Sequence, residues 1–145
     1  HSSNRRQRQM CIRDRELAAY TEFRTNNKDG YKFKKSYPYP TGENTLGLNC
    51  LNDCNFNYPS KYSKFLLRGY GHVSTSSTKK GINGLYDMGG NVWEWVDIND
   101  NSYKGTKGGS WWYGKNQMIQ GYNATKPKNM SAVYIGFRCV KDFKN

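Results

Sequence analysis

Glu94 stands between two tryptophans in the segment NVWEWV, and its position constrains the fold more than any other feature of the sequence. In an extended strand, successive side chains point to opposite faces. Trp93 and Trp95 then share one face, while Glu94 shares the other with Val92 and Val96. An ionised carboxylate among apolar side chains is costly unless another group compensates it. The segment therefore predicts either a solvent-exposed face or a partner of opposite charge for Glu94.

The composition predicts a loop-rich fold that is held together by aromatic clusters. The chain has 145 residues, enough for one domain or part of one, and includes 15 Gly, 12 Tyr and 4 Trp. Each aromatic side chain buries a large area, so a core can form without long aliphatic segments. No apolar run approaches the length that crosses a bilayer, so we expect no transmembrane segment.

Turn residues and local patterning place a few short elements. The stretch ELAAYTEFR, residues 16–24, contains good helix formers and is expected to be a helix or its end. Short strands are expected at 91–96, 107–112 and 135–140, because each run is bounded by Gly, Asn or Asp. Residues 45–82 show no sustained period of either kind.

The first fifteen residues, HSSNRRQRQMCIRDR, are interpreted as non-native. The string MCIRD resembles the translation of ATGTGTATAAGAGAC, part of a transposase adaptor used in sequencing libraries. We expect residues 1–15 to be adaptor-derived and exclude them from fold reasoning, as for a fusion scar. A natural basic arm is the alternative interpretation.

This exclusion changes the charge of the chain. Removing residues 1–15 takes away five arginines and one aspartate, which lowers the formal net charge from +12 to +8. The remaining lysines are scattered, although aromatic residues interleave with them near Tyr31, Phe33 and Tyr37, as in some nucleic-acid grooves. A solvated surface explains this pattern better, and we expect no nucleic-acid partner.

The cysteines and histidines limit the possible metal sites. Cys50 and Cys54, in NCLNDC, are close enough in the sequence to form a local disulfide, and two free thiols are the other possibility. A zinc site would need a second Cys/His cluster, and His1 and His72 are the only histidines. The sequence leaves the redox state of the cysteines open.

Three motifs occur in a fixed order: GLYDMGGNVWEWV, KGGSWW and GFRCV. Together with AAY and YPYPTGE, they resemble the sulfatase-modifying factor family, whose best-known members are formylglycine-generating enzymes. The resemblance runs from about Glu16 to Phe143. It implies an α+β, irregular C-type-lectin-like fold, loop-rich with short antiparallel strands. It also implies that residues 16–145 form the C-terminal part of a larger domain.

The family holds a structural calcium ion in the loop that GLYDMGGNVWEWV resembles. The ligands implied by position are Asp87, the backbone carbonyls of Gly90 and Val92, and the carboxylate of Glu94. Calcium suits such a set, because it takes 6–8 oxygens at about 2.3–2.6 Å. A second family site implies Asn55 and the carbonyl of Phe56. The alternative is a solvated Glu94 on an edge strand, without a metal.

Formylglycine-generating enzymes oxidise a peptide cysteine with oxygen and copper(I), which two cysteine thiolates bind. The resemblance puts Tyr113 and Met118 at the positions of that pair, and Tyr134 in place of a family asparagine. We therefore expect no copper and no formylglycine synthesis, although the family is one of oxidoreductases. Catalytic residues remain unknown. Cys139 matches a family disulfide position whose partner lies upstream.

The function expected is binding of a peptide, a glycan or an envelope partner in an aromatic groove. The groove candidates are Trp93, Ser110, Trp111, Trp112 and Tyr113, some of which would equally suit a core; Trp95 is expected in the core. Two alternatives are the C-terminal part of a non-haem-iron sulfoxide synthase, with metal ligands upstream, and a variable receptor domain of the C-type lectin kind. An extracytoplasmic or envelope location is favoured.

Overall fold

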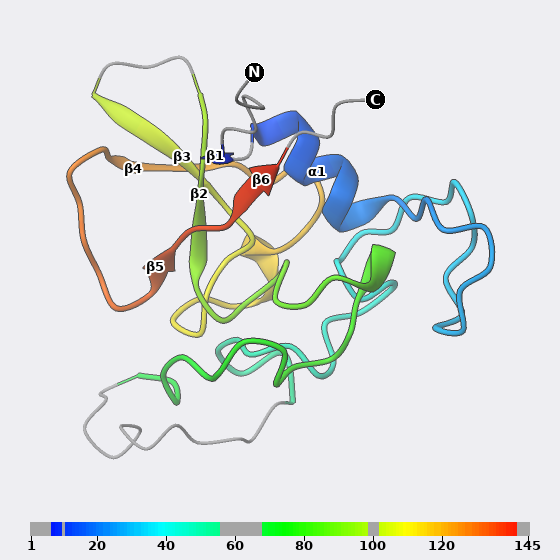
Figure 1. Cartoon of the computed structure of the whole chain (residues 1–145). Helices are drawn as coiled ribbons and strands as arrows, with labels where there is room; N and C mark the ends of the chain where they lie inside the picture. Colours follow the sequence, from blue (N-terminus) through cyan, green and yellow to red (C-terminus); the bar gives the residue numbers. More distant parts are fainter. Residues whose placement is uncertain (1–6, 10, 56–67, 99–101, 142–145) are drawn as a thin grey trace, which may run out of the picture.

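The structure is a computed structural model that describes residues 7–9, 11–55, 68–98 and 102–141 (Figure 1). In chain order, its elements are β1 (Gln7–Gln9), α1 (Ile12–Tyr20), η2 (Ile82–Gly84), β2 (Trp93–Val96), β3 (Tyr103–Lys107), η3 (Lys115–Gln117), β4 (Ala124–Pro127), β5 (Ile135–Gly136) and β6 (Cys139–Lys141). Long loops connect these short elements, so the predicted loop-rich α+β fold is confirmed.

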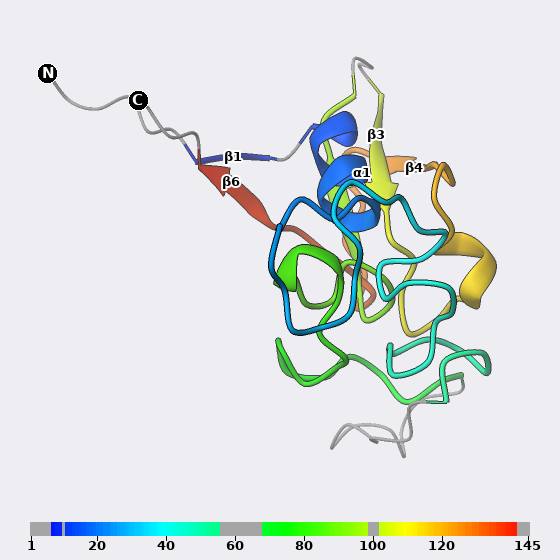
Figure 2. The same cartoon turned by 90° about the vertical axis from the view of Figure 1, so that its right-hand side faces the viewer.

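The main sheet has four strands in the order β4-β3-β2-β5. β2 pairs with β3 and β3 with β4 in antiparallel fashion, whereas β5 runs parallel to β2. β1 and β6 form a separate antiparallel ribbon that projects from the body of the molecule (Figure 2). Pro127 lies in edge strand β4, where proline is tolerated because one side of the strand needs no ladder partner.

The register of the sheet separates its two faces as the sequence predicts. Glu94 lies opposite Lys107, and Trp95 lies opposite Thr106. Helix α1 covers the face of Glu94 and Lys107, because Arg15 and Glu16 of α1 contact these two side chains. We call this the helix face; the opposite side, to which Trp93 belongs, is the aromatic face.

Helix α1 begins earlier and ends earlier than the sequence predicts. The Cys11 sulfur caps its first turn by accepting a hydrogen bond from the Asp14 amide at 3.4 Å. At the other end, the Asn83 side chain donates to the Ala18 and Thr21 carbonyls, which have no partners within the helix. The helix therefore ends at Tyr20, and residues 21–24 lie outside it. The adaptor origin of residues 1–15 stays a prediction, although four of these residues lie in α1.

Two of the three predicted strands need correction. Residues 107–112 are not a strand, because Gly108 and Gly109 have φ angles of +96° and +71°, outside the range of β structure. A Cβ at Gly108 would also lie 2.6 Å from Arg15 Nη2. The predicted strand 135–140 is divided into β5 and β6, and β4 was not predicted.

Two small clusters form much of the core. One contains Leu48, the Cys50–Cys54 disulfide and Met118. The other packs α1 against the GLYDMGGNVWEWV segment through Ala19, Tyr20 and Met88. The disulfide was one of the two states that the sequence left open for these cysteines. Cys139 carries a free thiol, as does Cys11.

Candidate functional site

Glu94 meets two arginines. Arg15 donates from Nε to Glu94 Oε2 at 3.1 Å, and its Nη2 lies 3.0 Å from the same oxygen. Arg138 donates from Nε to both carboxylate oxygens at 3.0 Å and from Nη2 to Oε1 at 2.8 Å. The side chain of Glu94 is 6% exposed. Of the two possibilities that the sequence left for Glu94, the structure has the partner of opposite charge.

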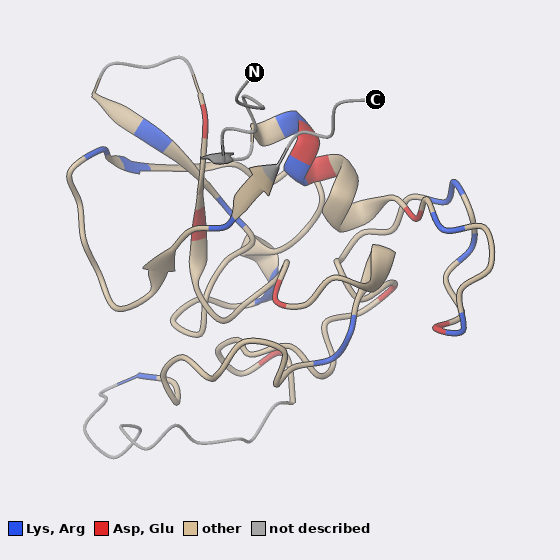
Figure 3. Ribbon diagram, viewed as in Figure 1, with Lys and Arg blue, Asp and Glu red and all other residues tan. Residues whose placement is uncertain are grey.

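The same guanidinium groups tie the preceding loop to the sheet. Arg15 donates to the Met88 carbonyl at 2.9 Å, and Arg138 donates to the Tyr86 carbonyl at 2.8 Å. Glu94 therefore connects α1, the 86–88 loop, β2 and the segment between β5 and β6. Charged residues occur on all of these segments (Figure 3). Removing the carboxylate would leave two cations in a largely buried place.

Of the four predicted calcium ligands, Asp87, Val92 and Glu94 line one pocket of about 340 Å³, whereas Gly90 does not line it. Asp87 and Gly90 have left-handed backbone with φ of 58° and 72°. A Cβ at position 90 would lie 2.4 Å from the Asn49 carbonyl oxygen, so only glycine fits this approach.

Both predicted carboxylate ligands already have partners. Asp87 accepts from the Thr78 hydroxyl at 2.6 Å and from the Ser76 amide at 3.2 Å. Glu94 is held by the two arginines. Of the second predicted site, Asn55 is exposed and Phe56 lies outside the described residues. Within the described residues, no three His, Cys, Asp or Glu side chains are grouped as metal ligands.

On the aromatic face, five rings form a connected set that we call the aromatic row: Trp93, Trp112, Tyr113, Tyr122 and Tyr134. Tyr113 meets Trp93 edge to face at 5.2 Å between ring centres and meets Tyr134 at 5.8 Å. Tyr122 lies 6.4 Å from Trp93, and Trp112 lies 5.9 Å from Tyr134. The rings come from four segments, so the row exists only in the folded chain.

The five predicted groove residues divide by burial. Trp93, Ser110 and Trp111 are at most 1% exposed, so they support the site from below. Trp112 and Tyr113 are partly exposed and belong to the surface of the row. Trp95, expected in the core, is only partly buried. Sequence reasoning missed Tyr122, and it took Tyr134 only as a replaced residue.

Two cations lie over rings of the row. Lys126 Nζ is 4.9 Å from the Trp93 ring centre and 5.6 Å from that of Tyr113. The Arg68 guanidinium is 5.7 Å from the Trp112 ring centre. Burial lowers the pKa of Lys126. Sequence reasoning missed both cations, and only their proximity to aromatic residues in the fold identifies them.

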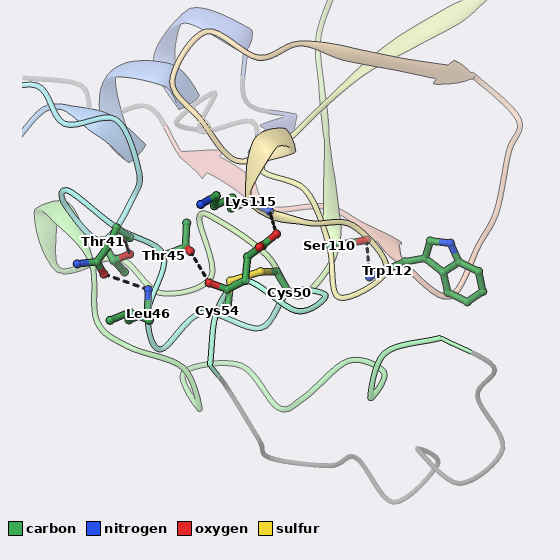
Figure 4. The surroundings of a disulfide bond; sticks show 10 residues. Thr41, Thr45, Leu46, Cys50, Cys54, Ser110, Trp112 and Lys115 are labelled. Atoms are coloured by element: carbon green, nitrogen blue, oxygen red, sulfur yellow. Dashed lines mark hydrogen bonds between the residues drawn. A yellow bond between two sulfur atoms is a disulfide. The ribbon is translucent and has the colours of Figure 1, made fainter.

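The loop that carries Tyr113 is fixed to the disulfide loop (Figure 4). The Leu51 amide donates to the Tyr113 carbonyl at 3.0 Å, and the Lys115 amide donates to Asp53 Oδ2 at 3.0 Å. The Ser110 hydroxyl accepts from the Trp112 amide at 3.2 Å. Residues 110–118 thus present Trp112 and Tyr113 on a well-anchored turn.

The short elements, long loops and small mixed sheet define an α+β domain of the formylglycine-generating-enzyme type. The sequence profile of the sulfatase-modifying factor enzyme 1-like domain matches residues 13–143, and this chain belongs to that family. No curated protein matches the chain significantly.

Solved structures show the same fold. CarF is 20% identical with a TM-score of 0.63, and the match covers 95% of this chain and 48% of CarF. PvdO from Pseudomonas aeruginosa is 17% identical with a TM-score of 0.62, covering 97% of this chain and 54% of PvdO. Treponema denticola variable protein 1 is 21% identical with a TM-score of 0.56, covering 92% of this chain and 46% of that protein. This chain therefore spans about half the length of these structures.

Proposed function

We propose that this domain binds a peptide, glycan or envelope partner through the aromatic row and performs no thiolate-copper chemistry. The observation that carries the proposal is the environment of the two positions that match the copper-binding cysteines. Tyr113 is a ring of the aromatic row, and Met118 is 0% exposed in the disulfide cluster. Its backbone carbonyl accepts a hydrogen bond from the Tyr20 hydroxyl at 2.5 Å. One position presents an aromatic surface, and the other belongs to the core.

The binding half of the proposal is tested with arrays of oligosaccharides and peptides. Wild-type protein should bind at least one class, and Tyr113→Ala should weaken that binding at least tenfold (about 1.4 kcal/mol). Phe33→Ala is the matched control, because Phe33 is 47% exposed on a loop outside the row. Equal losses in both variants, or no ligand in either array, would contradict the proposal.

The copper half is tested by competition for copper(I) against a chromogenic chelator. The chain carries free thiols at Cys11 and Cys139, so the measurement uses the variant in which both are serine. We expect this variant to take no stoichiometric copper from the chelator. One equivalent of tightly bound copper would overturn the assignment, because it would require a thioether such as Met118, or the reduced Cys50 and Cys54 thiolates, to act as soft ligands.

We propose further that calcium binds the 87–94 loop by replacing Arg138 at Glu94. The donor set suits the ion, with two carboxylates beside one pocket and a backbone that turns at Asp87 and Gly90. Arg138 is the more exposed of the two arginines at Glu94, at 27% against 1% for Arg15. Bound calcium would crosslink this loop and supply stability rather than catalysis.

The fold similarity to Treponema denticola variable protein 1 favours one alternative, a variable binding domain. In that case, sequences of related copies would differ most between Trp111 and Ile135, where the row has most of its exposed residues. Uniform sequences there would oppose this alternative. Both functions use the same surface, so the array experiment applies to both.

We propose an extracytoplasmic or envelope location. The Cys50–Cys54 disulfide is compatible with an oxidising compartment. None of the described helices is long and apolar enough to cross a membrane. Alkylation of the protein in intact cells, followed by mass spectrometry, should leave these two cysteines unmodified; alkylation of both would count against this location.

A further inference from the structure

The cations packed under α1 and the cations over the aromatic row differ in what neutralises them. On the helix face, Arg15 and Arg138 bind Glu94, and Lys107 Nζ lies 2.6 Å from Glu16. On the aromatic face, Lys126 and Arg68 lie over rings, and no carboxylate of the described residues is within ion-pair distance of either. A cation held over a ring keeps its full charge. The row therefore has an unneutralised positive charge near Trp93 and another near Trp112.

The backbone of the turn at residues 110–113 offers little to a peptide strand. The Trp112 amide donates to the Ser110 hydroxyl, and the Tyr113 amide donates to the Ser110 carbonyl. The Tyr113 carbonyl accepts from Leu51. Peptides that bind in extended form need free main-chain groups to pair with. Recognition at this turn must therefore use side chains.

The side chains present are those that suit a sugar. Trp112, Tyr113 and Tyr134 are partly exposed, and Tyr122 is 38% exposed. Their ring faces are rigid apolar surfaces against which the C–H groups of a sugar ring can pack. An ordinary tyrosine hydroxyl keeps its proton at neutral pH. Burial, followed by the neighbouring Tyr134, raises the pKa of Tyr113 further, so this hydroxyl is protonated. It can then donate a hydrogen bond to a sugar oxygen.

We propose that the aromatic row binds an acidic oligosaccharide, with sugar rings on the tyrosines and Trp112 and with carboxylates paired to Lys126 and Arg68. This inference rests on the ligand-binding function proposed above and names its ligand class. The formal net charge, +12 for the full chain and +8 without residues 1–15, adds a long-range attraction for such a polyanion. Charge and stacking together distinguish this ligand from neutral glycans and from acidic peptides.

The test compares a hexasaccharide of galacturonic acid with the same hexasaccharide in fully methyl-esterified form, by calorimetry on the full chain. We expect the acidic sugar to bind at least tenfold more tightly and to lose this advantage as salt rises. Lys126→Met and Arg68→Gln should each weaken binding of the acidic sugar about tenfold and leave the ester unchanged. Lys104→Met is the matched control, because Lys104 faces Lys126 across the β3–β4 ladder but pairs with Asp97 at 3.8 Å.

The outcomes separate this inference from the function on which it rests. Equal affinity for the acidic and the esterified hexasaccharide would contradict the preference for an acidic ligand, but it would leave the proposed ligand binding intact. If the protein bound an acidic peptide such as hexaglutamate and neither sugar, the assignment of a saccharide as the ligand class would be wrong. Failure of every sugar and peptide would overturn the proposed function itself. If Lys104→Met lost as much affinity as Lys126→Met, the loss would reflect the overall charge of the protein rather than a contact between Lys126 and the sugar. That result would contradict the assignment.

Discussion

The cations packed under α1 and the cations over the aromatic row are held in opposite ways. Under α1, the cations Arg15, Lys107 and Arg138 each meet a carboxylate. Beyond Trp93, Lys126 and Arg68 meet aromatic rings. A paired charge in the interior fixes structure, because breaking the pair leaves an uncompensated charge. A cation over a ring remains able to attract an anion. The comparison assigns stability to the helix face and ligand binding to the aromatic face.

The largest expected effect is on the helix face. Glu94→Gln should lower the free energy of unfolding by about 3–5 kcal/mol, because it leaves two guanidinium groups without their carboxylate. Urea denaturation measures this change. Glu43→Gln removes the same charge from an exposed pair with Lys35, 3.1 Å apart, and should cost less than about 0.5 kcal/mol. Similar costs for the two variants would contradict a structural role for the Glu94 pairs.

A smaller loss is expected at the second pair on this face. Lys107 is 0% exposed and donates to the Tyr122 carbonyl and to Asn123 Oδ1, besides its pairing with Glu16. Lys107→Met should cost about 1–3 kcal/mol, because these acceptors lose their donor. Thermal unfolding measures the loss. The control is again Lys104→Met, whose side chain is 35% exposed. A Lys107→Met protein as stable as wild type would show that the Lys107–Glu16 pair adds nothing to the hold of α1 on the sheet beyond packing and the Arg15–Glu94 pair.

Calcium sharpens the comparison at Glu94. If calcium replaces Arg138, Arg138→Met should have a larger rise in melting temperature on calcium addition than wild type does. The expected gain is about 1 kcal/mol at a calcium concentration several times the dissociation constant. Glu94→Gln should abolish the rise. Differential scanning fluorimetry with calcium, magnesium and chelator measures all three proteins. Identical melting curves under all conditions would contradict calcium binding at this loop.

The smallest expected effect on stability is on the aromatic face. Lys126→Met should change the free energy of unfolding by less than about 0.5 kcal/mol at pH 7, since the side chain is only partly buried. Burial lowers the pKa of Lys126 in the folded state, so the unfolded chain binds more protons between that pKa and the ordinary value of 10.5. The contribution of Lys126 to the free energy of unfolding therefore rises with pH across that window.

A comparison of wild type with Lys126→Met tests this pH dependence. The stability of wild type relative to Lys126→Met should increase from pH 8 to pH 11, as measured by urea denaturation at each pH. A decrease would mean that the charged form of Lys126 is favoured in the folded chain. In that case, the attraction of the ammonium group to the Trp93 and Tyr113 rings, or to a carboxylate, would outweigh the cost of its burial.

The sequence predicts local features of this molecule better than the contacts between distant segments. The alternation around Glu94 was readable because strand geometry depends on neighbouring residues. The partners were not readable, since Arg15 and Arg138 lie 79 and 44 residues away. Arg15 also belongs to the segment interpreted as adaptor-derived.

The candidate site shows the same limit. The GGSWWY motif identified Trp112 and Tyr113, but the row also needs Tyr122, Lys126 and Tyr134, which have no motif of their own. Tyr122 and Lys126 reach the row because β4 pairs with β3, and β4 was not predicted. Tyr134 reaches it because β5 pairs with β2. Residues 107–112 looked like a strand because tryptophans favour strands, whereas the left-handed backbone at Gly108 and Gly109 ends β3.

The most direct measurement of the central claim is a two-dimensional NMR titration of the tryptophan indole N–H signals with the galacturonic acid hexasaccharide. The chain has 4 tryptophans, so each indole can be assigned by single substitution. We expect the Trp112 and Trp93 signals to move with the ligand, and we expect the signal of Trp95, which lies on the same face but outside the aromatic row, to move less. Saturable binding that leaves the Trp112 and Trp93 signals unmoved would place the ligand elsewhere and contradict the assignment of binding to the aromatic face.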